Sequence, residues 1–269
     1  MKVVMNVYQY VNILSLDVAA GAVICSLFFA RIFHVVVSPY GLAALALTVW
    51  VIYTIDHLRD AKTIKTVAST DRHRFHQKYF RLILAILCFV IAVNFILIWF
   101  VPQRVLIVGL ALWVIVMVYL VFQRYLKFLK EFFVALLYTA GILLPSFSAM
   151  TLNPHTVHWV LIGKFFITAL MNLLLFSLFD CKEDQDQNQH SFVTWFGPAS
   201  TRTGILLLGL VNILSGIGLW SFDPGAALIF ISMNMMLLAI LFFQKHLMSD
   251  NRYRIFGDAV FFVPLLYLL

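Results

Sequence analysis

The chain has 269 residues, of which 63% are hydrophobic and only 12% charged, and its formal net charge is +7. A soluble domain carries about 25% charged residues, so this composition excludes a water-soluble globular protein. A transmembrane helix needs roughly 20 mostly apolar residues, so the chain has room for about nine or ten membrane crossings. The three cysteines include no CxxC pair, which argues against a disulfide framework.

Apolar runs bounded by charged residues or by Pro and Gly predict about nine spans, with no soluble domain or long linker between them. In chain order these spans lie at roughly 12–33, 39–58, 79–101, 104–123, 131–150, 157–179, 203–221, 225–244 and 255–269. The last of them is short for a membrane crossing. The predicted fold is an all-α polytopic transmembrane bundle in which residues 1–269 form a single domain.

The basic residues predict the orientation of this bundle. All Lys and Arg residues except Arg31, Arg104 and Lys164 lie before the first span or in the loops after spans two, four, six and eight. Because Lys and Arg collect in cytoplasmic loops, the N-terminus and every second loop should face the cytoplasm. Asp17 and Asp258 fall inside spans near these cytoplasmic ends. Acids within a span are costly and often functional, so we interpret both as shaping the polar end of a cavity.

Two aspartate pairs on that same side indicate a functional site. Asp56 and Asp60 end the second span, and Asp180 and Asp184 end the sixth. Aspartates at i and i+4 share one helical face, where like charges repel by a few tenths of a kcal/mol. Such pairs suit a cation, and sparse carboxylates suit Mg²⁺, which keeps several waters and bridges to phosphate oxygens. A solvated helix end accounts for either pair alone, but the doubling favours a shared Mg²⁺–diphosphate site.

Other polar residues near these pairs are candidates for substrate binding. Four basic residues of the cytoplasmic loops could neutralise phosphate, namely Arg72, Arg74, Lys127 and Lys130. The basic run at 72–76 is equally suited to a lipid-headgroup anchor. Asn172 lies two turns before Asp180 on the same helical face. Its amide would lie beside the metal site or make an interhelical hydrogen bond.

These segments resemble motifs of the UbiA superfamily of intramembrane prenyltransferases, which has nine transmembrane helices and aspartate-rich motifs after helices two and six. VIYTIDHLRD, at 51–60, is similar to the first motif, and DCKEDQDQN, at 180–188, is similar to the second. YLKFLK and SFVTWFG, which precede spans five and seven, are also similar to stretches of that family. The chain departs from the first motif at Ile52 and Tyr53, where the family has Asn and Asp. It departs from the second at Asn188, which carries no charge.

The resemblance implies an integral-membrane enzyme with Mg²⁺ as its cofactor. The catalytic, metal-binding residues would be Asp56, Asp60, Asp180 and Asp184. The substrate-binding residues would be Tyr53, Arg72, Arg74, Lys127, Lys130, Asn172 and Asn188. The expected partners are an isoprenyl diphosphate, a lipophilic or aromatic acceptor and the lipid bilayer, without nucleic acid. The expected location is a bacterial inner membrane, with the N-terminus and the site on the cytoplasmic side.

Three functions stay open at this point. The first is prenyl transfer, in which the allylic cation passes to an acceptor. The second is a terpene cyclase of the same type, in which a double bond of the same chain attacks the cation. Loss of the Asn-Asp pair at Ile52 and Tyr53 favours the cyclase, because an aromatic acceptor needs a nearby carboxylate to take its proton. The third is a non-catalytic membrane carrier or scaffold whose acids balance the basic loops.

Overall fold

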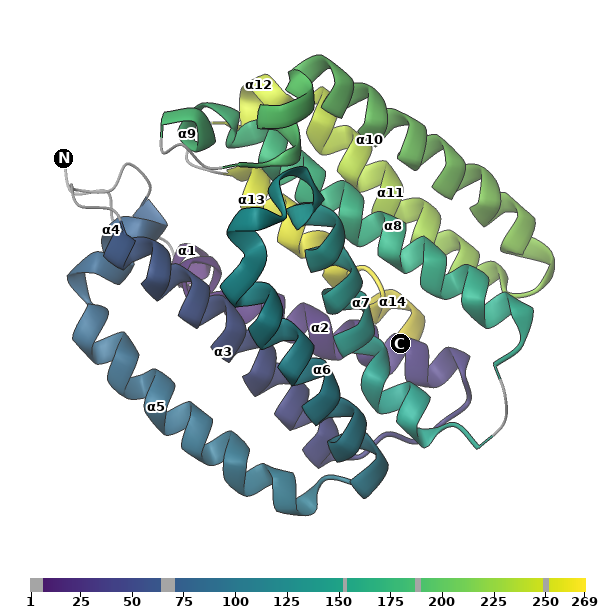
Figure 1. Ribbon diagram of the computed structural model, residues 1–269. Helices are drawn as coiled ribbons and strands as arrows, with labels where there is room; N and C mark the ends of the chain where they lie inside the picture. The colour runs from purple at the N-terminus through teal and green to yellow at the C-terminus, as the bar shows by residue number, and fades with distance from the viewer. Residues whose placement is uncertain (1–6, 64–70, 152–153, 187–189, 249–251) are drawn as a thin grey trace.

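The computed structural model describes residues 7–63, 71–151, 154–186, 190–248 and 252–269, and the regular structure in these ranges is helical throughout (Figure 1). Seven helices are long and apolar enough to cross a membrane. They are α3 (Pro39–Thr63), α5 (Phe80–Leu97), α6 (Gln103–Phe122), α7 (Lys130–Ala149), α8 (Thr156–Phe179), α10 (Phe192–Gly218) and α11 (Pro224–Phe242). The predicted all-α polytopic bundle is confirmed.

Short helices join or end these long ones. They are α4 (Asp71–Lys78), α9 (Cys181–Asp186), α12 (Gln244–Leu247), α13 (Arg252–Ala259) and α14 (Leu265–Leu268), with 3₁₀ turns η1 (Ile98–Phe100), η2 (Gln123–Tyr125), η3 (Lys127–Leu129), η4 (Leu219–Ser221) and η6 (Val260–Phe262). Helices α4, α9 and α12 lie at one end of the bundle (Figure 1). That end carries both aspartate motifs.

The first predicted span is bent. Helices α1 (Val7–Ile13) and α2 (Leu16–Ile32) meet at 76°, so they supply an eighth crossing only if they are counted together. Ser15 lies at the bend in the left-handed backbone region, with φ of 53°. Its hydroxyl lies 3.1 Å from Nε2 of His57 on α3. The helix is therefore interrupted at Ser15, and the interruption allows a polar contact with α3, which carries the first aspartate motif.

The ninth predicted span, at 255–269, is not one continuous helix. It is divided among α13, η6 and α14, and Pro264 precedes α14. Proline has no backbone N–H to continue a helix. Gly257 packs directly on α8, where an added Cβ would lie 2.7 Å from Oδ1 of Asn172. The missing side chain thus lets α13 approach α8 closely.

Helix α10 begins at Phe192, well before the expected start near residue 203. Ser191 and Thr194 form a capping box there, in which the Ser191 N–H donates to Oγ1 of Thr194 at 2.8 Å. A kink follows at Gly197, whose φ of 84° favours glycine, and Pro198 comes directly after it. The hydropathy pattern detected only the straight part of this helix.

The main core lies where α2, α8 and α11 pack together. Its largest fully buried side chains include Phe28, Phe29, Phe165 and Phe230, whose rings meet edge to face. Such pairs contribute about 0.5–1.5 kcal/mol each beyond the area they bury. Helices α5 and α6, by contrast, expose most of their apolar side chains, as expected of helices that face lipid.

Polar side chains also tie α8, α10 and α11 together. The ammonium of Lys164, which is 2% exposed, donates to the carbonyl of Asn212 and to Oγ of Ser215. Asn212 in turn donates to Thr168 at 3.0 Å and to Asn234 at 3.1 Å. Hydrogen bonds of this kind commonly stabilise the packing of transmembrane helices. Lys164 therefore has a structural role within the described part of the chain.

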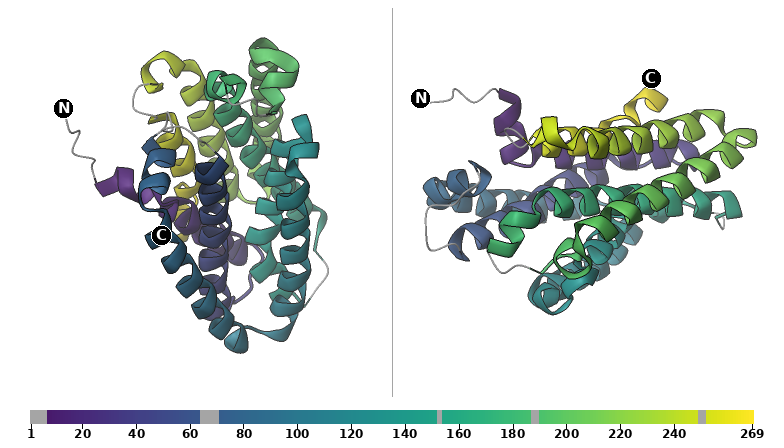
Figure 2. Two further views of the ribbon diagram at one scale, coloured as in Figure 1. Left: turned by 60° about the vertical axis from the view of Figure 1, so that its left-hand side comes forward. Right: turned by 90° about the horizontal axis from the view of Figure 1, so that it is seen from above.

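The long helices run alongside one another (Figure 2). Helix α5 packs on α3, whereas α6 packs on α7. A smaller apolar cluster, which includes Trp50, Leu58 and Leu87, joins α3 to α5. The space between these two helix pairs continues toward α8 and α13 and forms the cavity described next.

Candidate active site

A cavity of about 790 Å³ runs through the bundle between α3, α5, α6, α7, α8 and α13. Both aspartates of each motif line it, namely Asp56, Asp60, Asp180 and Asp184. Most of the remaining wall is apolar, with Ile91 on α5, Leu106 on α6 and Leu137 on α7 among its residues. The cavity thus joins a carboxylate-rich end to a long apolar interior.

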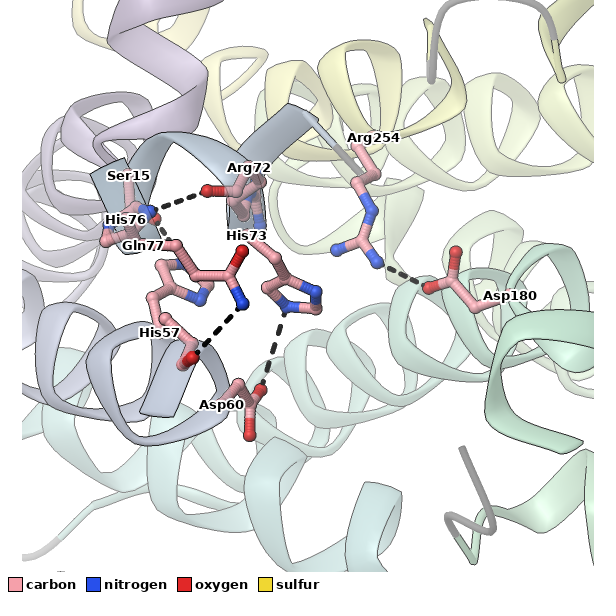
Figure 3. Close-up of polar contacts among 10 residues, drawn as sticks. Ser15, His57, Asp60, Arg72, His73, His76, Gln77, Asp180 and Arg254 are labelled. Carbon is pink, nitrogen blue, oxygen red and sulfur yellow. Dashed lines mark hydrogen bonds and ion pairs between the residues drawn. The ribbon is translucent and has the colours of Figure 1, made fainter. Parts of the chain in front are cut away.

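The first motif lies at the C-terminal end of α3. Oδ2 of Asp60 is 3.9 Å from Nε2 of His73 on α4 (Figure 3). Burial, together with the guanidinium groups of Arg254 and Arg72, lowers the pKa of His73 to about 4. His73 is therefore neutral near pH 7, so its contact with Asp60 is not a charged pair. His57, on the same helix, also lines the cavity while contacting Ser15.

The second motif lies where α8 ends and α9 begins. Asp180 caps α8 with non-helical backbone angles, yet the N–H of Asp184 still donates to its carbonyl at 2.9 Å. The helical spacing of the two aspartates therefore survives the break. Burial raises the pKa of the Asp184 carboxyl above its ordinary range, which an incoming cation would reverse.

Asp180 is held by two residues of α13. Arg254 NH2 lies 2.6 Å from its Oδ2 (Figure 3), and the hydroxyl of Tyr253 donates to its Oδ1. Arg254 and Tyr253 were not predicted as site residues, although the basic Arg-Tyr-Arg run before the last span was a signal for them. The C-terminal segment thus supplies a charged group to the second motif.

The remaining candidates divide between the cavity and the surface. Tyr53, Arg72, Lys130 and Asn172 line the cavity. Arg74 and Lys127 do not line it: Arg74 is exposed, and the Lys127 ammonium lies over the Trp195 ring, 5.2 Å from its centroid. Asn188 lies outside the described residues. The structure therefore brings together the aspartates and about half of the substrate-binding set.

A second polar network adjoins the cavity. Nδ2 of Asn12 donates to Oδ2 of Asp258 at 3.0 Å and to Oδ2 of Asp17 at 2.6 Å. Arg72 donates to Oδ1 of the same Asn12 at 3.0 Å and to its carbonyl at 3.1 Å. Asn12 was not among the predicted residues. The two intraspan acids are thus joined through one amide, and of the two only Asp258 lines the cavity.

The donors at the polar end fit Mg²⁺ by their chemistry. They are carboxylate oxygens, together with Oδ1 of Asn172, which is buried without a hydrogen-bond partner in the described part of the chain. Among the described residues no three carboxylate, imidazole or thiol groups converge on one point. Mg²⁺ is usually held by one or two carboxylates and substrate phosphates, not by an all-protein cage. This open arrangement suits a metal that arrives with a diphosphate.

No family model matches the chain, and no curated protein matches it. Several solved structures, however, match the chain over nearly its whole length. A UbiA homologue from Archaeoglobus fulgidus bound to DMAPP and Mg²⁺ is 11% identical with a TM-score of 0.65, and the match covers 96% of this chain and 98% of that one. For a UbiA homologue from the same organism bound to GPP and Mg²⁺, the identity is 12% and the TM-score 0.67, over the same shares.

The apo structure of a UbiA homologue from Aeropyrum pernix K1 gives 11% identity and a TM-score of 0.67, over 98% of this chain and all of that one. At such identities the likeness establishes the fold. It extends over nearly the whole chain, including the bent N-terminal and divided C-terminal segments. The chain has the polytopic helical fold of the UbiA homologues, as its two aspartate motifs predict.

Proposed function

We propose that the chain is an integral-membrane, Mg²⁺-dependent enzyme that ionises an isoprenyl diphosphate and transfers the prenyl group to a lipophilic or aromatic acceptor. One observation carries the proposal: the four motif aspartates share one end of a cavity whose long interior is apolar. An isoprenyl diphosphate has the same division into an anionic head and an apolar tail. The bound DMAPP, GPP and Mg²⁺ of the similar A. fulgidus structures support this choice of substrate.

Different residues at the polar end would bind the metal ions and the phosphate oxygens of the diphosphate head group. Asp56, Asp60, Asp180 and Asp184 would hold Mg²⁺, which when bound neutralises the charge on the departing pyrophosphate. Arg72 and Lys130 line the same end and would donate to phosphate oxygens. Asn172 offers a buried carbonyl oxygen nearby.

The apolar interior would bind the prenyl tail and protect the cation. Its wall includes Leu106, Trp113 and Phe176. A dry wall keeps water from capturing an allylic cation, and an aromatic face attracts positive charge by about 0.5–2 kcal/mol. We further propose that this polar end faces the cytoplasm from a bacterial inner membrane, and the distribution of basic residues among the loops supports that orientation.

The cyclase alternative rests on a specific feature of the cavity wall. Ile52 and Tyr53 line it at the positions where the resembling motif carries Asn and Asp. An apolar side chain and a phenol replace an amide and a carboxylate there, so this part of the wall offers a polar acceptor fewer hydrogen-bonding groups. Attack by a double bond of the same prenyl chain would need no such groups.

Product analysis of the purified protein tests the proposal. The detergent-solubilised chain is incubated with geranyl, farnesyl or geranylgeranyl diphosphate and Mg²⁺, with and without a phenolic acceptor. We expect Mg²⁺-dependent pyrophosphate release, accelerated by the acceptor and accompanied by prenylated product. A cyclic hydrocarbon or a cyclic terpene alcohol formed without acceptor would favour the cyclase. No turnover in any mixture would overturn both and favour a carrier or scaffold.

A further inference from the structure

Besides the four motif aspartates, two carboxylates line the cavity, Glu131 on α7 and Asp258 on α13. Glu131 accepts from the N–H of Phe192 at 3.0 Å. Asp258 follows Arg254 by four residues on α13, which corresponds to one turn, or about 6 Å. Arg254 pairs with Asp180, so it marks the level of the second motif. Gly257, the neighbour of Asp258, contacts Phe176 and Asn172, which lie one and two turns inside Asp180 on α8. Asp258 therefore lies about one turn further along the cavity wall than the Arg254–Asp180 pair, beside the level of Phe176 and Asn172.

This carboxylate is held from one side and open on the other. Asn12 donates to its Oδ2 at 3.0 Å, and Arg72 fixes Asn12 by donating to both of its oxygens. Within the described residues, Oδ1 of Asp258 accepts no hydrogen bond, and the residue lines the cavity. The charged or titratable groups around it are Asp17 on α2, Arg72 on α4, Tyr53 on α3, Tyr8 on α1, Tyr138 on α7 and its own neighbour Arg254. One oxygen is thus oriented, and the other is available to a ligand.

A purely structural role does not account for this arrangement. Asp17 already accepts from the same Asn12 amide at 2.6 Å and is 1% exposed. It therefore ties α1 to α2 without facing the cavity. A second carboxylate in a mostly apolar wall is costly to maintain. Its position at the start of the tail-binding interior suits a group that acts on carbon.

We propose that Asp258 is the general base that removes the proton released when the prenyl cation reacts, an inference that rests on the function proposed above. The C1–O bond breaks and pyrophosphate leaves with the electron pair. A π bond of the acceptor, or of the prenyl chain itself, then forms the new carbon–carbon bond to the cation. Oδ1 of Asp258 takes a proton from a carbon next to the resulting cationic centre, which in an aromatic acceptor is the ring carbon that formed the new bond, and the C–H electrons restore the double bond or the aromatic ring. No oxidant or reductant is required.

An acceptor-free reaction tests this role without knowledge of the acceptor. With geranyl diphosphate and Mg²⁺ alone, the cation either is captured by water to give an alcohol or loses a proton to give a hydrocarbon. The wild-type chain should form hydrocarbon. Asp258→Asn should lower the hydrocarbon-to-alcohol ratio by about 10²-fold, the usual scale of general-base catalysis, while still releasing pyrophosphate.

The matched control is Asp223→Asn, which neutralises a carboxylate that accepts from the Tyr267 hydroxyl at 2.7 Å and does not line the cavity, and it should leave the product ratio unchanged. Asp258→Ser repeats the test should Asp258→Asn fail to fold, and Asp258→Glu should restore hydrocarbon. An unchanged ratio in the Asn and Ser variants, or alcohol as the sole wild-type product, would overturn the role of Asp258 while leaving the proposed function standing. Absence of pyrophosphate release from the wild-type chain in every mixture, with or without acceptor, would instead overturn both.

Discussion

Neutralising one aspartate on each side of the cavity separates the catalytic role of the motifs from their structural role. We consider Asp56→Asn, Asp180→Asn and the double variant. The two aspartates have different surroundings. Asp180 accepts from Arg254 at 2.6 Å and from Tyr253, and its side chain is 14% exposed. Asp56 has no hydrogen bond or ion pair within the described residues.

The magnitudes follow from these surroundings. Loss of a group that stabilises developing charge commonly costs about 10²–10³ in rate, so each single variant should lose that much pyrophosphate release. The double variant should lose far less than the product of the two factors, because groups that act as one unit are strongly non-additive. For stability, Asp180→Asn leaves the partly buried Arg254 without its carboxylate, which costs about 1–3 kcal/mol. Asp56→Asn should change stability by no more than about 0.5 kcal/mol.

Two measurements on detergent-purified protein check these values. Mg²⁺-dependent pyrophosphate release from geranyl diphosphate reports the catalytic loss. Thermal unfolding reports stability, at about 2–4 °C per kcal/mol for a chain of this size. The reasoning fails if either single variant keeps near wild-type release, or if the two losses multiply. Equal destabilisation by both substitutions would refute the assignment of Arg254 to Asp180 alone.

Three further predictions concern regions away from the aspartates. Cysteines introduced at the exposed Lys62 and Gln103, in a background without other reactive thiols, should be labelled from the cytoplasmic and the opposite side respectively, because the basic loops predict that orientation. Lys164→Met should cost about 1–3 kcal/mol through the loss of its bonds, including that to Ser215, and should leave turnover intact because Lys164 does not line the cavity. His76→Gln should reduce acid lability, measured as the unfolding temperature against pH. Burial lowers the pKa of the wild-type imidazole, more than its backbone hydrogen bond raises it. The native state therefore disfavours protonation and loses stability as pH falls below the unfolded value of about 6.5.

Each of these predictions has a clear contrary result. Labelling of Lys62 from the opposite side would reverse the orientation and place the aspartate site away from the cytoplasm. A large loss of turnover in Lys164→Met at unchanged stability would give that lysine a functional role. An acid-unfolding profile of His76→Gln that overlays the wild type would show that this imidazole titrates normally in the folded chain.

The sequence predicted the membrane class, the long helices and the four aspartates, because each is encoded locally. Roughly 20 apolar residues identify a span, and a spacing of four places two carboxylates on one face. Arg72, Lys130 and Asn172 followed from their closeness to the motifs along the chain or along one helix. In the described structure all three reach the cavity.

The contacts that the sequence did not predict depend on side-chain direction and on long-range packing. Lys127 lies in the expected loop, but its backbone takes a φ of 48° and its ammonium rests on Trp195. Arg254 is far from Asp180 along the chain, and only the packing of α13 on α8 brings them together. Asn12 likewise meets Asp258 through a contact that spans nearly the whole sequence. Local sequence patterns do not predict such long-range contacts.

Several breaks and ends of helices are the places where polar groups enter the site. Irregular backbone at membrane depth is tolerated where it is buried in protein or lines a cavity. The bend at Ser15 follows Asn12, the break between α8 and α9 contains Asp180, and α13 gives way to η6 directly after Asp258 and its neighbour. A straight helix at any of these points would satisfy its own backbone but would carry the polar side chain past the cavity. Polar residues near the end of an apolar run therefore indicate where a span is most apt to break, and in this chain they coincide with the groups to which we assign chemistry.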